Sequence, residues 1–232
     1  MAVVKLWQEN NLSNATIKNR LSALRHLAKL IKKPYLIPSN SDLNVGKRKY
    51  VSTENHALIN PDFTYITNKN IKISLELQRI LGLRREESLK IKPHLAHRDN
   101  QLHLQSSWCK GGRGRMIPNK TDEQRYWLEE AKKVVGQAGN SLIPQGKTYI
   151  LQRHLYDKQV QHAGLKNLHG LRHAYAQKPY KELTGWDAPI CGGLKSSEYT
   201  PEQKEKDHLA RMILAEELGH SREQITVNYC GR

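Results

Sequence analysis

Six residues spread along the chain have side chains suited to the chemistry of phosphate esters. They are one tyrosine, two arginines, one lysine and two histidines: Tyr229, Arg84, Arg172, Lys110, His169 and His220. A guanidinium group can bind two phosphate oxygens at once, and an imidazole can donate or accept a proton near neutral pH. A tyrosine can act as the nucleophile of a covalent intermediate. Brought together, these groups could cut and rejoin a nucleic-acid backbone.

Arg84 lies in the sequence Gly-Leu-Arg-Arg-Glu-Glu, directly after an apolar segment. That segment has helical spacing of its apolar residues, which are Ile73, Leu77, Ile80 and Leu81. We expect Gly82 to end the helix and to hold Arg84 in the turn that follows.

His169 and Arg172 belong to the sequence His-Gly-Leu-Arg-His, which is expected to open another helix. Their spacing of three places both side chains on one face, so that a single phosphate can contact both. The amino end of a helix also attracts anions. This segment therefore predicts a second phosphate-binding element.

His220 lies in the sequence Leu-Gly-His-Ser, which predicts the end of one helix and the start of another. Ser221 and Gln224 have the spacing of a capping box, so we expect a helix to begin there and to carry Tyr229 two turns further along. His220 would then lie in the corner between two helices. A short, frayed terminal segment would let the phenol of Tyr229 move toward a phosphate.

In this order the motifs resemble those of the tyrosine recombinase, or phage integrase, family. The family pattern is an arginine in a Gly-Leu-Arg-x-x-Glu turn, a hairpin lysine, His-x-x-Arg, Leu-Gly-His and a carboxyl-terminal tyrosine, and the match spans roughly residues 75 to 230. Each motif alone is weakly specific, whereas the ordered set in a basic chain is specific. The resemblance implies a mainly α fold with a small three-stranded antiparallel sheet, in which a shortened helical core-binding domain precedes the catalytic domain.

The resemblance also implies a role for each residue of the set. Tyr229 attacks the phosphorus of one DNA strand, which gives a 3′-phosphotyrosine and a free 5′-hydroxyl. Arg84, Arg172 and His220 contact the non-bridging oxygens. His169 accepts the phenol proton or shares the phosphate contact.

Lys110 is the expected general acid for the leaving 5′-oxygen, and a flexible glycine-rich hairpin carries it. Arg113 and Arg115 are alternatives close in sequence, and they are better suited to binding DNA phosphates. Glu87 either supports the arginines from behind or is an ordinary surface charge of its helix.

No cofactor or metal is expected, because the phosphotyrosine keeps the energy of the broken bond. The sequence Gly-Lys-Thr at 146–148 is similar to the end of a phosphate-binding loop, but Ser141 stands where that loop requires glycine. Two histidine pairs have no cysteine or carboxylate at ligand spacing, which argues against a zinc site in either pair: His94 with His97, and His169 with His173.

The bulk composition indicates a polyanionic partner. The 232 residues carry a formal net charge of +16 with a pI near 9.8, and lysine and arginine occur along the whole length. A non-catalytic nucleic-acid binder would have the same charge. Three scattered cysteines, no apolar run of membrane-spanning length and no secretion signal predict a cytoplasmic protein.

The first 48 residues predict a partial helical, SAM-like DNA-binding domain with a linker, and residues 49–232 predict the catalytic domain. One amphipathic helix is expected from Asn14 to Lys33, capped by Ser13 or Asn14, with an apolar stripe formed by Ile17, Leu21, Leu24, Ala28 and Ile31. A basic stripe lies about a quarter turn away and consists of Lys18, Arg25, Lys29 and Lys32. This stripe either follows a DNA backbone or is an ordinary solvated face.

The segment after Arg84 predicts three short strands, at 94–98, 101–107 and 116–118. A capping box at Thr121 predicts the next helix, and helices are expected from there to the end. The segment 178–206 is rich in Gly, Ser, Pro and charge, and it is longer than the family usually has there. We expect an inserted, mobile loop.

The leading functional hypothesis is a site-specific recombinase of double-stranded DNA. Four protomers would hold two synapsed duplexes, and the free protein could be a monomer. The alternatives are a type IB topoisomerase, which acts as a monomer, and a DNA-binding relative without catalysis. The target sequence cannot be predicted, because phosphate contacts position a protein whereas base contacts specify the site.

Overall fold

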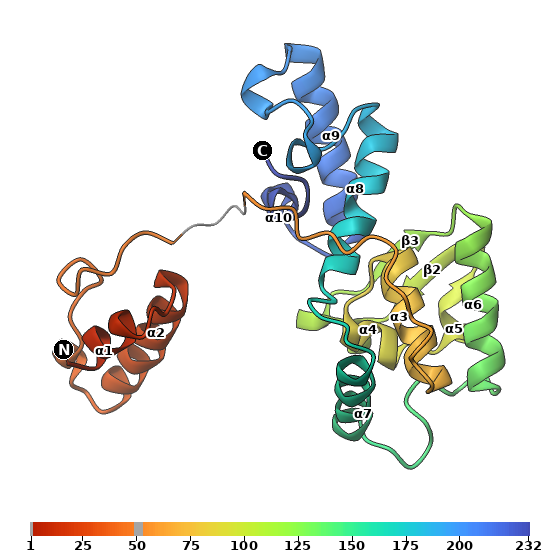
Figure 1. Cartoon of the computed structure of the whole chain (residues 1–232), viewed down its shortest axis with the longest axis horizontal. Coiled ribbons are helices and arrows are strands. Elements are labelled where there is room, and N and C mark those ends of the chain that lie inside the picture. Colours follow the sequence, from red (N-terminus) through yellow and green to blue (C-terminus); the bar gives the residue numbers. More distant parts are fainter. Residues whose placement is uncertain (1, 49–52) are drawn as a thin grey trace. The chain divides into compact units, whose positions relative to one another are not determined.

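A computed structural model describes residues 2–48 and 53–232 of the chain (Figure 1). Contacts divide the chain into two units, Met1–Ser52 and Thr53–Arg232. Each unit has a hydrophobic core of its own, so each is described by itself.

In the first unit, α1 (Ala2–Glu9) and α2 (Asn14–Leu30) are followed by the short 3-10 helix η1 (Pro34–Leu36). The predicted cap is confirmed, since the Ser13 hydroxyl accepts a hydrogen bond from the Thr16 amide at 3.2 Å. The unit's core consists of Val4, Ile17, Leu21, Leu43 and Val45, with Ala28 buried nearby.

Two expectations for the first unit are wrong. Helix α2 ends at Leu30 instead of Lys33, because Lys32 has a φ of 57° in the left-handed region. Ile31, expected in the apolar stripe, is therefore outside the helix and 54% exposed. Helix α1 was not predicted, because its residues Ala2–Glu9 lack a capping signal.

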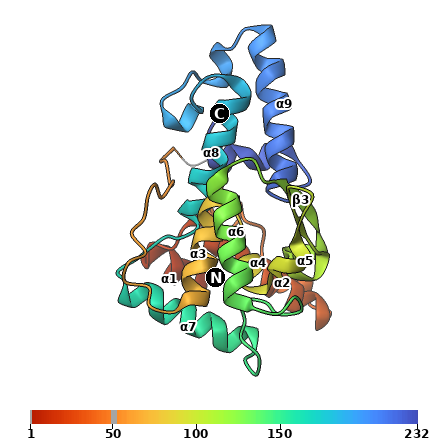
Figure 2. The ribbon, with the colours of Figure 1, turned by 90° about the vertical axis from the view of Figure 1, so that its right-hand side faces the viewer.

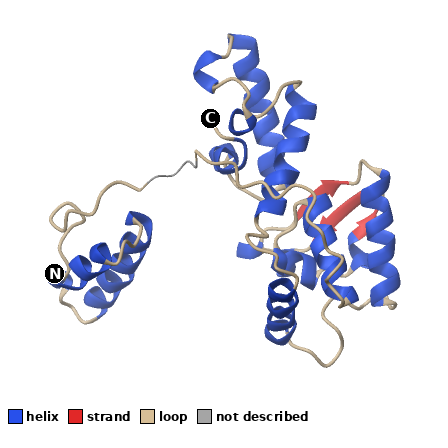
Figure 3. Ribbon diagram, in the orientation of Figure 1, coloured by secondary structure: helices blue, strands red, loops and turns tan. Residues whose placement is uncertain are grey.

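The second unit contains the predicted antiparallel sheet, in the order β1 (His97–Arg98), β2 (Gln101–Leu104) and β3 (Arg115–Pro118). Figure 3 shows these strands together on one side of the unit. The first strand is shorter than expected, because α5 (Pro93–Ala96) takes up the residues before it. Proline at the first helical position favours this start, since its φ is already helical.

The largest core of the second unit lies between this sheet, α3 (Lys69–Leu81) and α6 (Asp122–Val135). Figure 2 shows α6 along one side of the sheet. The predicted capping box is confirmed: the Gln124 amide donates to the Thr121 hydroxyl at 3.2 Å, and the Gln124 side chain accepts from the Thr121 amide at 3.0 Å. Leu77, Leu102 and Leu128 are completely buried where these elements meet.

A separate core joins α8 (Gly170–Thr184), α9 (Pro201–Glu217) and α10 (Val227–Cys230). The bounds of the loop expected at 178–206 are wrong, because α8 continues to Thr184 and α9 begins at Pro201, so that the connection covers only residues 185–200. The segment between the two helices is held by hydrogen bonds of aromatic residues. Trp186 Nε1 donates to the Tyr199 hydroxyl at 3.1 Å, and the Tyr180 hydroxyl lies 3.2 Å from the same Tyr199 hydroxyl.

The end of the chain also differs from the prediction. No helix begins at Ser221; instead the 3-10 helix η6 (Glu223–Thr226) leads into the short α10. Arg211 fixes this end, because its guanidinium donates to the Thr226 hydroxyl at 3.3 Å and to the Gly231 carbonyl at 3.0 Å.

The remaining elements connect these parts. They are α4 (Arg85–Lys90), η2 (Ser106–Trp108), η3 (Lys110–Gly112), α7 (Tyr149–His162), η4 (Pro189–Cys191) and η5 (Ser196–Glu198). Within the described ranges, no helix is both long and apolar enough to cross a membrane.

Candidate active site

Arg172 lies in the first turn of α8 and is 1% exposed. Its Nη1 donates to the carbonyl of Gly82, and its Nη2 donates to the carbonyl of Leu218. Its Nε donates to the hydroxyl of Tyr229 at 3.2 Å. Burial lowers the pKa of Arg172, but a guanidinium stays protonated in proteins. One buried cation thus joins three segments that are distant in sequence.

Gly82 is required at the end of α3 for two reasons. Its φ of 60° is left-handed, as predicted for a helix-ending glycine, and a Cβ there would lie 2.3 Å from the ring of Tyr175. The close approach of α8 to this turn lets the Gly82 carbonyl reach Arg172. The same turn leads into Arg84.

Tyr229 lies in α10 and is 4% exposed. Its hydroxyl is 3.1 Å from Nε2 of His220 and receives the hydrogen bond from Arg172. Its carbonyl accepts from Gln177 Nε2 at 3.0 Å. The segment is therefore packed rather than frayed, and the phenol already contacts two of the predicted phosphate ligands.

The two predicted histidines differ in their relation to the phenol. Burial and the charges of Arg172 and Arg84 lower the pKa of His220 to about 4. The pKa of His169 is lowered by the same causes, although its side chain reaches solvent. Both imidazoles are thus neutral at neutral pH. The hydroxyl contacts His220, whereas the His169 and Tyr229 rings lie 6.2 Å apart between centroids.

Glu87 has a fully buried side chain behind the arginines, so the interpretation as a surface charge is wrong. It accepts from the Arg84 amide at 2.8 Å and from Arg84 Nη1 at 2.7 Å. Burial alone would raise its pKa, but the hydrogen bond and charge of Arg115, together with Arg84, lower it to about 2. Glu87 is therefore ionised and fixes both guanidinium groups.

Arg115 does not fit its expected role as a phosphate clamp. Its side chain is 3% exposed, its terminal nitrogens donate to Glu87 at 3.0 and 2.8 Å, and its Nε donates to the Glu217 carbonyl at 2.6 Å. Its buried, paired guanidinium therefore stabilises the interior of the unit. Arg113, two residues earlier, is exposed.

A pocket of about 570 Å³ opens beside Arg172, and we call it the cationic pocket. Its lining includes five of the predicted residues, namely Arg84, Glu87, Lys110, His169 and Arg172. Lys110 is on η3 and exposed. Tyr229 and His220 do not line this pocket, but both contact Arg172, which joins the two groups.

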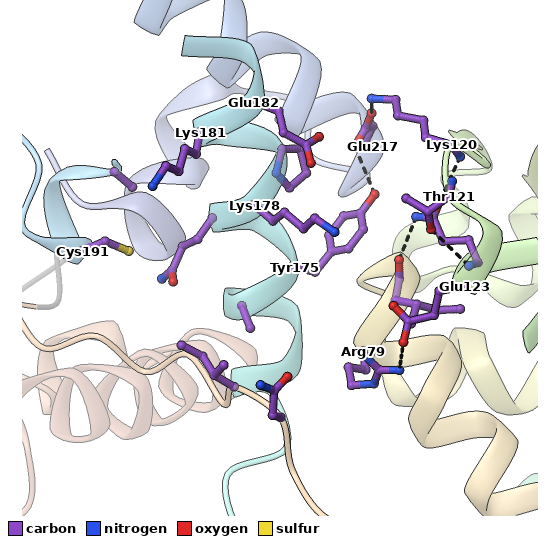
Figure 4. A pocket seen from close by; sticks show the side chains of 18 of the residues that line it. Arg79, Lys120, Thr121, Glu123, Tyr175, Lys178, Lys181, Glu182, Cys191 and Glu217 are labelled. Atoms are coloured by element: carbon purple, nitrogen blue, oxygen red, sulfur yellow. Dashed lines mark hydrogen bonds and ion pairs between the residues drawn. The ribbon is translucent and has the colours of Figure 1, made fainter. Parts of the chain in front are cut away.

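A second pocket, of about 510 Å³, lies between α8 and the amino end of α6, and we call it the paired pocket (Figure 4). Its cations face its carboxylates: Arg79 lies 2.5 Å from Glu123, and Lys181 lies 2.9 Å from Asp187. The Tyr175 hydroxyl, also in this pocket, donates to Glu217 at 3.1 Å.

The basic stripe of the first unit is only partly available for a ligand. Arg25 donates to Asn40 Oδ1 at 3.0 Å and to the Pro38 carbonyl at 2.5 Å, so it supports the following loop. Lys29 and Lys32 are exposed, and Lys18 is half-buried.

Two residues near Tyr229 were missed as site residues. His173 packs against the Tyr229 ring, and Gln177 binds its carbonyl. Together with His169 they follow a spacing of four along α8, which places all three on one helix face. That spacing was present in the sequence and would have identified them.

The chain is similar to a known protein family and to a solved structure. The family model described as Integrase matches residues 46–178, which is more than half of the chain and ends before His220. The structure of the Tn1549 transposon integrase in complex with circular intermediate DNA is similar, with a TM-score of 0.54 and 15% sequence identity over 100% of this chain and 79% of that chain. No curated protein sequence matches. The predicted fold class is confirmed.

Proposed function

This chain belongs to the integrase family, and from that premise we propose that it is a site-specific DNA recombinase that acts through a 3′-phosphotyrosine at Tyr229. The observation that carries the proposal is the contact of one buried hydroxyl with Arg172 and His220. A phenol held by a guanidinium and a neutral imidazole is suited to attack on a phosphodiester.

We propose that the scissile phosphate enters the cationic pocket. Arg84 has 22% of its side chain exposed there and is oriented by Glu87. Arg172 is buried, and its Nε is occupied by the phenol. A non-bridging phosphate oxygen would take the place of the phenol at Arg172, which frees the hydroxyl to approach the phosphorus.

The attack forms the bond between the Tyr229 oxygen and phosphorus and breaks the bond from phosphorus to the 5′-oxygen. The phenol proton goes to a neutral histidine. His220 is the better placed acceptor, because its Nε2 already lies 3.1 Å from the hydroxyl. His169, at the start of α8 on the pocket lining, would then contact the phosphate.

The leaving 5′-oxygen takes a proton from Lys110, which shares the pocket with both arginines. A 5′-hydroxyl of another strand reverses the sequence, and the same proton transfers run backward. No cofactor takes part in the proposed bond changes and proton transfers.

Double-stranded DNA is the proposed partner, and the similar transposon integrase was solved with DNA. We propose that residues 1–48 are the DNA-binding domain and residues 49–232 the catalytic domain, with Lys18, Lys29, Lys32 and Arg113 as phosphate contacts. We also propose that a homotetramer forms on two synapsed duplexes. Relaxation of a supercoiled plasmid by the monomer would favour the topoisomerase alternative instead.

The test uses a nicked duplex whose cleavage releases a short fragment and so prevents religation. We expect the wild-type protein to form a covalent protein–DNA adduct and Tyr229→Phe to form none. Tyr126→Phe, at a tyrosine that is 56% exposed on α6, is the matched control and should form the adduct normally. Equal adduct formation by wild type and Tyr229→Phe would contradict the proposal.

A further inference from the structure

His173 follows Arg172 on α8 and has no part in the chemistry proposed above. Its side chain is 7% exposed, and its Nδ1 is buried without a hydrogen-bond partner among the residues that the structure describes. A buried polar atom without a partner costs about 1–3 kcal/mol. Hydrogen bonding by Nδ1 therefore does not explain why a histidine is buried at this position.

The ring of His173 makes the closest ring contact of Tyr229. Their centroids are 4.8 Å apart with an interplanar angle of 61°, compared with 5.8 Å for His220 and 6.2 Å for His169. This is the edge-to-face arrangement that aromatic pairs prefer. This contact is with the phenol ring alone, whereas Arg172 and His220 contact the ring and also bind the hydroxyl.

Two further rings pack against the His173 ring. His169 lies 5.3 Å away at 83°, and His56 lies 5.9 Å away at 90°. The chain at 56–58 runs against the start of α8, since the Leu58 amide donates to the Gly170 carbonyl at 2.9 Å and a Cβ on Gly170 would lie 2.4 Å from the His56 carbonyl oxygen. The His173 ring is thus confined by the rings of Tyr229, His169 and His56.

The ring also stays uncharged at neutral pH. Burial, with the charges of His169, His56 and Arg172, lowers the pKa of His173 to about 4. A cation at this place would repel Arg172, and a neutral aromatic ring does not.

We propose that His173 is a positioning residue for the nucleophile: its confined ring, packed edge-to-face on the phenol, holds the hydroxyl of Tyr229 beside Arg172 and His220. This inference rests on the proposed function of Tyr229. It assigns to His173 no contact with DNA and no proton transfer.

The test compares three substitutions of His173 by the rate of covalent adduct formation at saturating nicked DNA. His173→Ala removes the ring and should lower the rate about tenfold or more, because a misplaced nucleophile loses its near-attack geometry. His173→Phe keeps a ring and should restore the rate to within about threefold of wild type. His173→Asn keeps polarity without a ring and should resemble His173→Ala.

DNA affinity and folding are the controls. The dissociation constant for intact DNA should change less than about twofold in all three variants, because their phosphate ligands are intact. His162→Ala, at an exposed histidine that ends α7, should match wild type throughout. An unchanged rate in a folded His173→Ala protein would overturn the proposal, and so would recovery by His173→Asn but not by His173→Phe.

A second readout does not depend on activity. In protein carrying ¹³C-labelled tyrosine rings, the Tyr229 resonance is identified by its loss in Tyr229→Phe. We expect it to move in His173→Ala and to stay in place in His162→Ala. If the wild-type protein formed no adduct, the proposed function would fail, while an unmoved resonance would separately contradict the positioning contact.

Discussion

The cationic pocket and the paired pocket both lie against α8, yet their charges are arranged differently. The cationic pocket is lined by five cationic side chains and three carboxylates, whereas the paired pocket has four of each. In the paired pocket, one carboxylate on α6, one on α9 and one in the loop after α8 each pair with a nearby cation.

This difference shows that the net charge of +16 does not make every basic surface of the molecule an anion site. Cations that outnumber the nearby carboxylates and stay accessible attract anions, as we propose for Arg84 and Lys110. The one carboxylate buried deepest in the cationic pocket, Glu87, orients arginines instead of cancelling the pocket's charge.

The largest expected effect separates two cations of the same helix. Arg172→Ala should lower the rate of adduct formation at least about 100-fold, because the fixed cation at the transition state is removed. Lys178→Ala, which removes a cation of the paired pocket, should leave the rate within about twofold. Single-turnover assays on nicked DNA measure both, and thermal unfolding verifies that each variant folds. Equal losses of rate in the two variants would contradict the functional difference between the two pockets.

The next comparison concerns two buried carboxylates. Glu87→Gln leaves the buried Arg115 without its ionic partner, so the free energy of unfolding should fall by about 3 kcal/mol. Glu217→Gln keeps a hydrogen bond to Tyr175 and should cost only about 1 kcal/mol. Urea unfolding at neutral pH measures the difference. A larger loss in the free energy of unfolding for Glu217→Gln would show that Glu217 stabilises the fold more than Glu87 does.

Stability should also depend on pH through the histidines near Arg172. His173 has a folded pKa of about 4, while an unfolded histidine has about 6.5. Between these values the unfolded chain binds more protons than the folded protein does. The free energy of unfolding is therefore highest above pH 6.5 and falls as the pH drops toward 4. The decline from this residue is up to about 3 kcal/mol, and His220 acts in the same direction. His173→Phe should flatten the profile of unfolding against pH, and an unchanged slope would contradict the assignment.

The smallest expected effect is on the salt dependence of DNA binding. Lys110→Ala and Lys166→Ala each remove a cation of the cationic pocket. The logarithm of the association constant for DNA should then depend less steeply on the logarithm of the salt concentration, by about one in slope for each phosphate that is no longer neutralised. Lys178→Ala and Lys181→Ala should leave the slope unchanged. Titrations over a series of salt concentrations distinguish these outcomes, and a smaller slope for the second pair would place DNA on the paired pocket.

Local signals in the sequence predicted most of the fold. The glycine at position 82, the caps at Ser13 and Thr121, and the antiparallel strands all depend on a few neighbouring residues. The bounds of the loop expected at 178–206 are wrong, because α8 and α9 extend into it. The contact between Trp186 and Tyr199 in the remaining segment joins residues 13 positions apart, and no local pattern encodes it. The capping box at Ser221 failed because Arg211, on the preceding helix, holds the end of the chain in another conformation.

The candidate site shows the same limit. Which residues carry the chemistry could be proposed from motifs, but not that Arg115 turns inward to Glu87 or that the phenol rests on Arg172. These contacts join residues 28 and 57 positions apart, and no local pattern encodes them. In the sequence, His173 stands out only as half of a histidine pair.

The central claim is that the Tyr229 hydroxyl attacks the phosphate bound by Arg84 and Arg172. The most direct measurement is mass spectrometry of peptides from the adduct trapped on nicked DNA, which locates the attachment among the 10 tyrosines of the chain. We predict that the 3′-phosphate is attached to Tyr229. Attachment at any other residue, or an adduct that survives in Tyr229→Phe, would contradict the account.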